Sequence, residues 1–423
     1  MTAFPRIDGN RCGCDEVSQP GTLISIDAAL AKIERLARGV SEFETVALSQ
    51  SLGRVLAVSV RAAGMVPAYD NAAMDGYAVH TQDLQIDAQT ELPVVGRIAA
   101  GHAPPTRLER RTAMQIFTGA PVPEGANAVV MQELVSRQGD RIRLNSNVLP
   151  GDHIRRTGED MLKGKIIVPA GRSLSARDIA ACAAAGHERV KVARRVRVAL
   201  LVTGDEVTPQ GQVTGAASTW DVNTPMLRAA ISAPGIDLCH VQIARDCQHH
   251  VQSQLQEIAK TSDLIVTTGG ISVGDEDHVK PALSALSAQI AFSGVAMKPG
   301  KPVSFGRLGN AYWLGLPGNP LSAFVTWHLF GTVLCDCLAG RSPERLGRRH
   351  VILQRALHHK PGRCELRLGR LSGFVGSGLE VVDFPEASHS GRVSLFGEMD
   401  GLLFIPADAD VLPKGSLVEF QPF

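Results

Sequence analysis

The sequence has almost no charge imbalance and few aromatic residues. Its 423 residues carry 43 Lys and Arg against 42 Asp and Glu, which leaves a formal net charge of +1. Proteins whose main task is to grip a nucleic-acid backbone usually carry a clear excess of positive charge. The 13 Phe, 3 Trp and 3 Tyr also leave few rings on which bases could stack. We therefore expect no nucleic-acid partner.

The sequence also lacks a zinc-type cysteine pattern and any secretion or membrane signal. Its 8 Cys include the spaced pairs Cys12/Cys14 and Cys335/Cys337, but no C-x-x-C pair and no Cys/His ladder. The N-terminus shows no basic patch followed by an apolar run. The most apolar long stretch, residues 323–338, contains charge and is shorter than a bilayer span. These features predict a cytoplasmic protein with reduced thiols and no membrane association.

Glycine and proline, in contrast, are abundant, at 42 and 24 residues. This excess indicates many tight turns, and backbone that can approach a ligand closely. At about 150 residues per domain, the length predicts two to four domains. Each would be large enough to bury a hydrophobic core without disulfides.

The pattern changes along the chain. Residues 1–22 lack periodicity and are predicted to be a flexible tail, an interpretation preferred over a metal or sulfur site at Cys12 and Cys14. An amphipathic helix is predicted from Ser25 onward. Short apolar runs between turn residues at about 44–150 then predict a β-rich subdomain. We expect residues 23–193 to form an N-terminal region of two subdomains.

Residues 194–341 follow a different pattern, in which strands alternate with helices. The nearly continuous apolar run at 196–202 is typical of a strand buried on both faces. Further strands at 235–244 and 264–268 alternate with helix-like stretches, which predicts a parallel α/β sheet covered by helices. Ligands of such sheets bind at the carboxyl ends of the strands. Residues 346–423 become β-like again and predict a C-terminal β domain.

Two acidic motifs follow predicted strands of this α/β domain. In the TGDE motif, the carboxylates of Asp205 and Glu206 can hold Mg²⁺ or cap a helix, and capping is the commoner use. In TTGGISVGDED, glycines after a strand can offer N–H groups to a phosphate. Three carboxylates beside such a cradle call for a bridging cation, so a functional site is preferred here over a solvated turn. The spacing of a Walker or Rossmann loop is absent.

Two further motifs are rich in turn-forming residues. The segment PAYDNAAMDGYAV, residues 67–79, is equally consistent with a structural loop and with a site. KPGKP (298–302) and GLPGNP (315–320) are stiff loops, and the lysines of the first offer ammonium groups to an oxyanion. Alone, such a loop is usually a surface turn. Together with the acidic loop, it predicts a Mg²⁺-assisted enzyme that acts on a phosphorylated small molecule.

In this order, the chain's motifs resemble the MoeA family of molybdopterin molybdenumtransferases, which includes the E domains of gephyrin and of its plant counterpart. The resemblance rests on DNAAMDGYAV, IFTGAPVPEGANAVVMQE, IRRTGED, VALLVTGDE, WDVN, TTGGISVGDED, MKPGKP and GLPGNP, and it spans residues 24–423. It implies a MogA/MoaB-like three-layer α/β domain with a parallel-rich sheet, β-rich N-terminal subdomains and a C-terminal β-barrel-like domain. It also implies an elongated homodimer.

The resemblance further implies the reaction. Adenylylated molybdopterin and molybdate would give molybdenum cofactor and AMP with Mg²⁺, at a late step of cofactor biosynthesis. The protein partners implied are a molybdopterin adenylyltransferase and downstream cofactor-processing proteins. Adenylylation of molybdopterin is a second enzymatic reading, because both activities use this type of α/β domain. A scaffold role is the third, but no additional fused domain favours it.

The family's functional positions match residues of this chain one by one. The resemblance assigns catalytic roles to Asp75, Thr118, Asp160, Glu206, Asp246, Asp277, Lys298 and Lys301, with Glu206, Asp246 and Asp277 as the Mg²⁺ ligands. Substrate binding is assigned to Thr268, Gly269, Gly270, Ser272, Gly274, Asp275, Asp221, Asn223, Pro317, Gly318, Asn319, Pro320 and Ser390.

The chain departs from some relatives at two positions. Gly294 stands where they carry a further lysine, and Leu368 aligns with an arginine of the C-terminal module, beside Arg367 and Arg370. Both differences concern molybdate capture.

Overall fold

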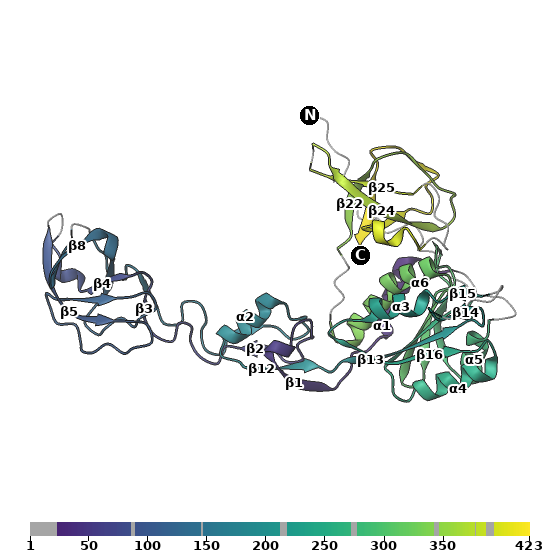
Figure 1. Ribbon diagram of the computed structural model, residues 1–423, viewed down its shortest axis with the longest axis horizontal. Coiled ribbons are helices and arrows are strands. Elements are labelled where there is room, and N and C mark those ends of the chain that lie inside the picture. Colours follow the sequence, from purple (N-terminus) through teal and green to yellow (C-terminus); the bar gives the residue numbers. More distant parts are fainter. Residues whose placement is uncertain are drawn as a thin grey trace.

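The computed structural model describes residues 23–85, 89–144, 147–211, 218–271, 277–341, 347–376, 378–385 and 393–423. The tail predicted for residues 1–22, with Cys12 and Cys14, lies outside this part of the chain. The molecule is elongated (Figure 1). A β-rich module lies at one end, a smaller α/β module follows, and the large α/β domain and the C-terminal β domain lie together at the other end (Figure 1).

The distal module is built on a six-stranded sheet with strand order β7-β4-β6-β5-β9-β8. Its buried side chains alternate along the strands and form clusters on both sides of the sheet. The strands are β4 (Gly76–Val79), β5 (Thr90–Ile98), β6 (Ala113–Ile116), β7 (Ala128–Met131), β8 (Val135–Gln138) and β9 (Arg141–Leu144), and the short pair β3 (Asn71–Ala72) and β10 (Ile154–Arg155) lies beside them. The 3₁₀ turns η2 (Thr81–Asp83) and η3 (Gln132–Leu134) connect strands.

The middle module is built from residues that precede the distal module in the chain and from residues that follow it. β1 (Phe43–Ala47) pairs with β12 (Arg189–Ala193), and β2 (Val60–Arg61) pairs with β11 (Ile166–Val168). Helix α2 (Ala176–Ala184) begins with a capping box between Ser175 and Asp178. The turn η1 (Leu48–Gln50) follows β1. The β-rich subdomain expected from about residue 44 thus differs from the structure at its start, because β1 and β2 find their partners 100 or more residues later.

The large α/β domain has three layers around a sheet of order β16-β13-β17-β21-β20-β18. The first four strands of that order are parallel, and β20 and β18 run antiparallel to their neighbours. The strands are β13 (Val196–Thr203), β16 (Ile236–Ala244), β17 (Leu264–Thr268), β18 (Gln289–Ser293), β20 (Ser304–Leu308) and β21 (Ala311–Leu316). The helices are α1 (Ile26–Leu36), α3 (Asn223–Ile231), α4 (Gln248–Ile258), α5 (Val279–Ala285), α6 (Pro320–Thr326) and α7 (Thr332–Leu338).

Strand β13 shows why its apolar run is continuous. Leu200 joins the core cluster that also holds Ile33 of α1 and Leu227 of α3, whereas Leu201 joins the cluster with Leu255 of α4. Successive side chains of a strand point to opposite faces, so a strand covered by helices on both sides needs apolar residues at every position. The prediction of a doubly buried parallel strand is confirmed.

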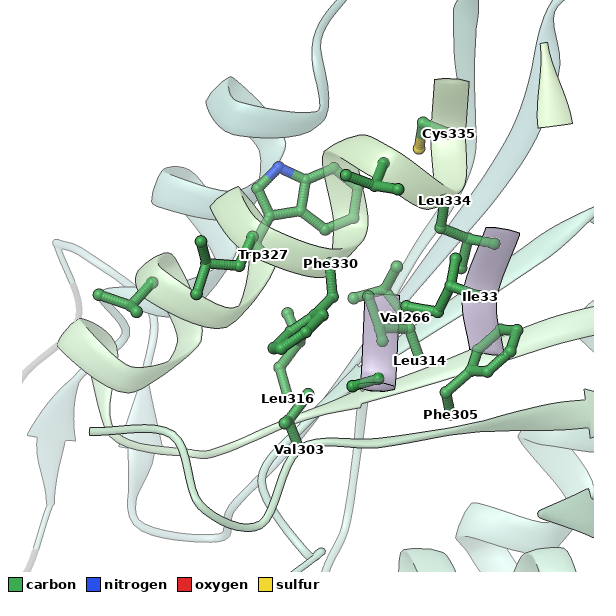
Figure 2. Packing of buried hydrophobic residues seen from close by; sticks show 14 of the residues in the cluster. Ile33, Val266, Val303, Phe305, Leu314, Leu316, Trp327, Phe330, Leu334 and Cys335 are labelled. Atoms are coloured by element: carbon green, nitrogen blue, oxygen red, sulfur yellow. The ribbon is translucent and has the colours of Figure 1, made fainter. Parts of the chain in front are cut away.

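A long apolar helix covers one face of this sheet. α6 and α7 are joined by a π-helical turn, Trp327–Gly331, so that the helix runs over 19 residues, Pro320–Leu338. By length and composition this helix could cross a membrane, whereas the shorter stretch 323–338 was predicted not to span one. However, 72% of it is buried inside the protein, and Figure 2 shows Phe330 and Leu334 pointing toward the sheet. Burial in the core explains its apolar composition.

The C-terminal domain is a closed barrel. β24 (Cys364–Phe374) pairs with both β25 and β26, so the order β24-β25-β22-β28-β26 returns to its first strand. The remaining barrel strands are β22 (Arg349–Leu353), β25 (Glu380–Asp383), β26 (Gly401–Ile405) and β28 (Leu417–Pro422). Within the region 346–423 that is predicted to be β-like, a 3₁₀ turn, η5 (Phe396–Glu398), precedes β26. The short strands are β19 (Met297–Lys298), which pairs with β24, β23 (Leu357–His358) and β27 (Val411–Leu412).

Candidate functional site

A cavity of about 1000 Å³ opens at the carboxyl ends of β13, β17 and β21, the sheet edge where the sequence predicts a site. Loops from separate parts of the chain line it, including the segment around β14 (Val207–Thr208) and β15 (Thr219–Trp220). Among the predicted site residues, those that line the cavity are Glu206, Asp221, Asn223, Asp246, Gly269, Gly270, Asp277, Pro317, Gly318, Asn319 and Pro320.

The glycines after β17 are required by close backbone packing. Gly269 has φ +88°, and a Cβ on it would lie 2.7 Å from the carbonyl oxygen of Thr203. Any larger residue would therefore push the loop after β17 away from the end of β13. Gly318 also lies against Gly269, since a Cβ on it would lie 3.4 Å from the Gly269 Cα. The two glycines let three loops meet at the floor of the cavity.

Asn223, at the start of α3, holds two of these loops together. Its side-chain amide donates to Thr268 Oγ1 at 3.0 Å and to the Gly318 carbonyl at 2.6 Å. The Thr268 hydroxyl in turn donates to the Pro317 carbonyl at 3.0 Å. Asp221 accepts the N–H of Thr224 at 2.9 Å, which satisfies a free donor at the start of the helix. Thr268 is fully buried, so it supports the cavity from below and does not line it.

Several buried polar atoms of the cavity wall have no partner within the protein. Of the described residues, those with such atoms include Thr203 (Oγ1), Asn223 (Oδ1) and Asn319 (Oδ1). A buried polar atom without a hydrogen bond costs free energy, about 1–3 kcal/mol. All three residues line the cavity. Groups of this kind are suited to a polar ligand that supplies the missing hydrogen bonds.

The cavity is also lined by acidic residues. Asp205 and Asp246 exchange hydrogen bonds, the N–H of each donating to the carboxylate of the other at 3.1 Å. Burial raises the pKa of Asp246, and the charges of Asp205 and Glu206 raise it further, against the lowering effect of the Asp205 N–H. Asp277 lines the same cavity. Three or more carboxylates around one space repel one another unless a cation enters.

These oxygen donors match the chemistry that Mg²⁺ prefers, and the raised pKa of Asp246 marks the concentration of negative charge that a divalent cation would relieve. Within the described ranges, no group of three His, Cys, Asp or Glu side chains is close enough together to hold a metal ion by itself. The carboxylates therefore fit a site that is completed by ligand oxygens or water, as is common for Mg²⁺.

The KPGKP loop, residues 298–302, contributes a proline to the cavity lining and not the lysines that the sequence singled out. Pro302 lines the cavity, whereas Lys298 and Lys301 are exposed and do not line it. Lys298 lies on β19, opposite Glu365 of β24 in the barrel. Burial alone would raise the pKa of Glu365, but hydrogen bonds from Arg367 and His359, with the charges of Arg367 and Lys298, lower it. The sequence could not show that this loop is shared with the C-terminal domain.

The two departures from the family pattern have structural reasons. Gly294 has φ +99°, and a Cβ there would lie 2.8 Å from the Leu23 side chain, so a lysine would be strained at this position. Leu368 is 4% exposed and belongs to the core that the barrel shares with the α/β domain. Arg367 does not replace the aligned arginine freely, because its Nε donates to Glu365 at 2.8 Å.

Three predicted site residues lie far from the cavity. In the distal module, Asp75 accepts hydrogen bonds from the Thr118 hydroxyl at 2.6 Å and from the Thr118 N–H at 2.8 Å. These bonds, the side-chain bond first, lower the pKa of Asp75. Asp160 lies in the chain between β10 of the distal module and β11 of the middle module, and its N–H donates to the Val66 carbonyl. The resemblance assigned roles to Asp75 and Thr118 but showed neither their hydrogen bonds nor the distance of their module from the cavity, which is evident in Figure 1.

Ser272, Gly274, Asp275 and Ser390 lie outside the described residues. Other lining residues were missed by the sequence analysis. Thr203 and Asp205 belong to the TGDE motif already singled out, and Trp220 directly precedes Asp221. Val393 comes from the C-terminal segment, and no sequence signal could have placed it on this cavity.

The fold and the cavity together define a class. This is an α/β domain with a polar, partly acidic pocket at the carboxyl edge of its sheet, the edge where proteins of this architecture bind their ligands. Three family models match in succession: the MoeA N-terminal region (domain I and II) at residues 24–186, the "Probable molybdopterin binding domain" at 199–335, and the MoeA C-terminal region (domain IV) at 350–423.

Curated relatives agree with these matches. A Molybdopterin molybdenumtransferase of Haemophilus influenzae is 33% identical over 320 residues, which is 75% of this chain and 78% of the relative. Molybdopterin molybdenumtransferase 2 of Mycobacterium tuberculosis is 33% identical over 384 residues, 89% of this chain and 94% of the relative. A crystal structure of the molybdopterin biosynthesis MoeA protein from Pyrococcus horikoshii superposes with a TM-score of 0.80 at 26% identity, covering 95% of this chain and 100% of that one. The chain belongs to the MoeA family, and the predicted fold class is confirmed.

Proposed function

We propose that this protein is a molybdopterin molybdenumtransferase that inserts molybdenum from molybdate into adenylylated molybdopterin and releases AMP. The observation that carries the proposal is the combination of two kinds of lining group in the cavity at the sheet edge. The first, called here the polar wall, is glycine backbone with the buried polar atoms of Thr203, Asn223 and Asn319, which have no partner among the described residues. The second, called the acidic wall, is the carboxylates of Asp205, Glu206, Asp246 and Asp277. The names of the relatives support the transfer of molybdenum to molybdopterin.

The polar wall would bind the substrate. The adenylylated pterin carries two linked phosphate groups, whose oxygens accept hydrogen bonds from backbone N–H groups and hydroxyls. The loop after β17 and the loop at Pro317–Pro320 meet there, held by Asn223. Rigid loops position the phosphoanhydride without losing much conformational entropy on binding. Hydrolysis of the phosphoanhydride takes up one water, leaves one phosphate on the molybdopterin and releases the other as AMP.

The acidic wall would hold Mg²⁺. We propose that its protein ligands come from among Glu206, Asp246 and Asp277, with substrate oxygens and water completing the coordination, because these three side chains are not grouped closely enough to hold the ion by themselves. When bound, the cation neutralises phosphate charge and polarises the phosphoanhydride. Asp205 keeps Asp246 in place through their exchanged hydrogen bonds.

Lys298 and Lys301 would collect molybdate, the second substrate. Molybdate is a dianion, and exposed lysines attract it at long range and bind it as point charges. Because Pro302 lines the cavity directly after these lysines, the anion would be delivered to its edge. Ser390 of the C-terminal module is proposed as a substrate-binding residue from the resemblance to the family alone.

A homodimer would bring the distal residues into the site. Asp75 and Thr118 lie at the far end of the molecule from the cavity (Figure 1). If they act on the same substrate as Glu206 and Asp277, they must come from a second copy, and a twofold arrangement would give each cavity one distal module. We place this enzyme in the cytoplasm, between the adenylyltransferase that supplies its substrate and the proteins that use the cofactor.

The test is an assay of AMP release by the purified protein with adenylylated molybdopterin and Mg²⁺, with and without molybdate. We expect molybdate to stimulate AMP release and active cofactor to form. AMP release that does not respond to molybdate would reject molybdenum insertion as the function.

A further inference from the structure

Trp220 lines the cavity. Its side chain is 47% exposed, whereas the other two tryptophans, Trp313 and Trp327, are 0% and 2% exposed and belong to the core. Among the described residues that line the cavity, Trp220 is the only aromatic one. Single exposed apolar residues are common on protein surfaces. A tryptophan inside a ligand cavity is different, because a bound molecule can cover its ring.

The backbone holds Trp220 at a defined place. β15 pairs in parallel with β14, with Thr208 opposite Trp220. The N–H of Thr219 donates to the Glu206 carbonyl at 2.8 Å, and the N–H of Asp221 donates to the Thr208 carbonyl at 2.9 Å. These bonds tie the tryptophan on both sides to the segment that carries Glu206. The ring is therefore attached to the same rigid unit as the acidic wall of the cavity.

We propose that Trp220 is a specificity-determining residue that stacks on a flat heteroaromatic ring of the substrate. The inference rests on the proposed function and deepens it. The substrate has two such rings, the pterin and the adenine, and both offer a π-face to an indole. Stacking on tryptophan depends little on the type of ring. What the pterin and the adenine share is that each is a planar ring system containing nitrogen.

The wall near Trp220 provides an acceptor for such a ring. The Asn223 amide oxygen is buried, lines the same cavity and has no partner among the residues described. Pterin and adenine both carry an exocyclic amino group that can donate to an amide oxygen. A stacking surface together with a hydrogen-bond acceptor is a common way to recognise a heterocycle without contacting its phosphates.

The experiment compares ring-bearing and ring-free probes by calorimetry. AMP and pterin-6-carboxylate each carry one of the rings, and ribose 5-phosphate carries the sugar phosphate alone. We expect Trp220→Ala to weaken binding of at least one ring-bearing probe roughly 10- to 100-fold, and Trp220→Phe to retain most of the affinity. Ribose 5-phosphate should bind both variants as it binds the wild type. The probe that loses affinity identifies the stacked ring.

Two further measurements separate stacking from a structural role. Trp220→Leu keeps an apolar side chain without a π-face, and we expect it to behave like Trp220→Ala. Phe374→Ala is the matched control, since Phe374 is 71% exposed on the barrel and does not line the cavity. In steady-state assays, Trp220→Ala should raise KM for adenylylated molybdopterin more than it lowers kcat. Because Trp220 is the exposed tryptophan of the three, AMP or the pterin should change the wild-type fluorescence but not that of Trp220→Phe.

The inference is overturned if neither ring-bearing probe loses affinity in Trp220→Ala, or if ribose 5-phosphate loses as much as they do. Those outcomes leave the proposed function intact, provided that the wild type still releases AMP in response to molybdate. Failure of the wild type in that assay would reject the function, whereas ring-dependent loss of binding would still support the stacking role.

Discussion

The amide nitrogen of Asn223 lies 3.0 Å from Thr268 Oγ1 and 2.6 Å from the Gly318 carbonyl, so one side chain joins the start of α3 to both loops at the floor of the cavity. This explains why the WDVN, TTGG and LPGNP motifs occur together. Thr268 lies 45 residues after Asn223 in the chain, and Gly318 lies 95 residues after it. A single amide therefore fixes the shape of the proposed substrate-binding wall.

Asn223→Ala should destabilise the protein and weaken substrate binding. It removes two largely buried hydrogen bonds and leaves the Gly318 carbonyl unpaired, which should lower the free energy of unfolding by about 1–3 kcal/mol. Urea unfolding measures this loss, and KM for adenylylated molybdopterin should rise in parallel. Asn310→Ala, at an exposed turn between β20 and β21, is the control and should change neither. Equal effects in both variants would contradict the role of Asn223.

Removal of an acidic side chain from the cavity should slow turnover. We expect Glu206→Ala and Asp277→Ala each to reduce molybdate-dependent AMP release about 10²–10³-fold, equivalent to about 3–4 kcal/mol of transition-state stabilisation. Asp237→Ala, at the opposite end of β16 from the cavity, should retain activity. If both cavity variants kept wild-type activity, the site would have been placed wrongly.

Mixing two inactive variants should restore activity if the distal module acts on the cavity of a second copy. Co-expressed Asp75→Ala and Glu206→Ala chains should recover about a quarter of the wild-type rate, because random pairing makes half of the dimers mixed and each mixed dimer has one intact site. Glu206→Ala with Asp277→Ala should recover nothing, since both changes lie in the same cavity. Absence of recovery in the first mixture would contradict a shared site.

The pH dependence of stability should report the raised pKa of Asp246. Because the folded protein holds this proton more tightly than the unfolded chain, stability falls as the pH rises from the ordinary aspartate value, about 3.9, through the folded pKa. The penalty then persists at neutral pH. Asp246→Asn removes it and keeps an oxygen that can accept the Asp205 N–H. We expect this variant to melt at a higher temperature than the wild type at pH 7, with the difference vanishing below pH 4.

Mg²⁺ should act on the same carboxylates. It should raise the melting temperature of the wild type at pH 7, because a ligand of the folded state stabilises it by mass action. The rise should be smaller in Asp246→Asn, whereas Asp237→Asn should respond as the wild type does. An equal response of all three proteins would exclude Asp246 from the metal site.

Much of the α/β domain was predictable because its elements are local patterns. The helix that starts after Ser25 is α1, with Ser25 accepting the Ala28 N–H as its cap. The continuous apolar run is β13, and its continuity follows from helices on both faces. The position of the acidic and glycine-rich loops at one sheet edge follows from the parallel order of the strands.

Other features depended on contacts between distant residues. The segment that was expected to begin the distal β-rich module pairs instead with residues 166–193, across the whole length of that module. Lys298 was expected in the cavity, yet it lies on a short strand against the barrel, opposite Glu365. Neither pairing leaves a local signal, because the partner strand is chosen by the packing of the complete chain.

The sequence by itself determined the family, the order of the elements and the residue types of the proposed site, since motifs and periodicity are properties of neighbouring residues. Only the tertiary structure decided which of those residues share a cavity, that Asp75 and Thr118 lie far from it, and that Trp220 lines it. The near-neutral total of 43 against 42 charges could not show that four carboxylates line one cavity. Such local charge arises when folding brings separate loops together.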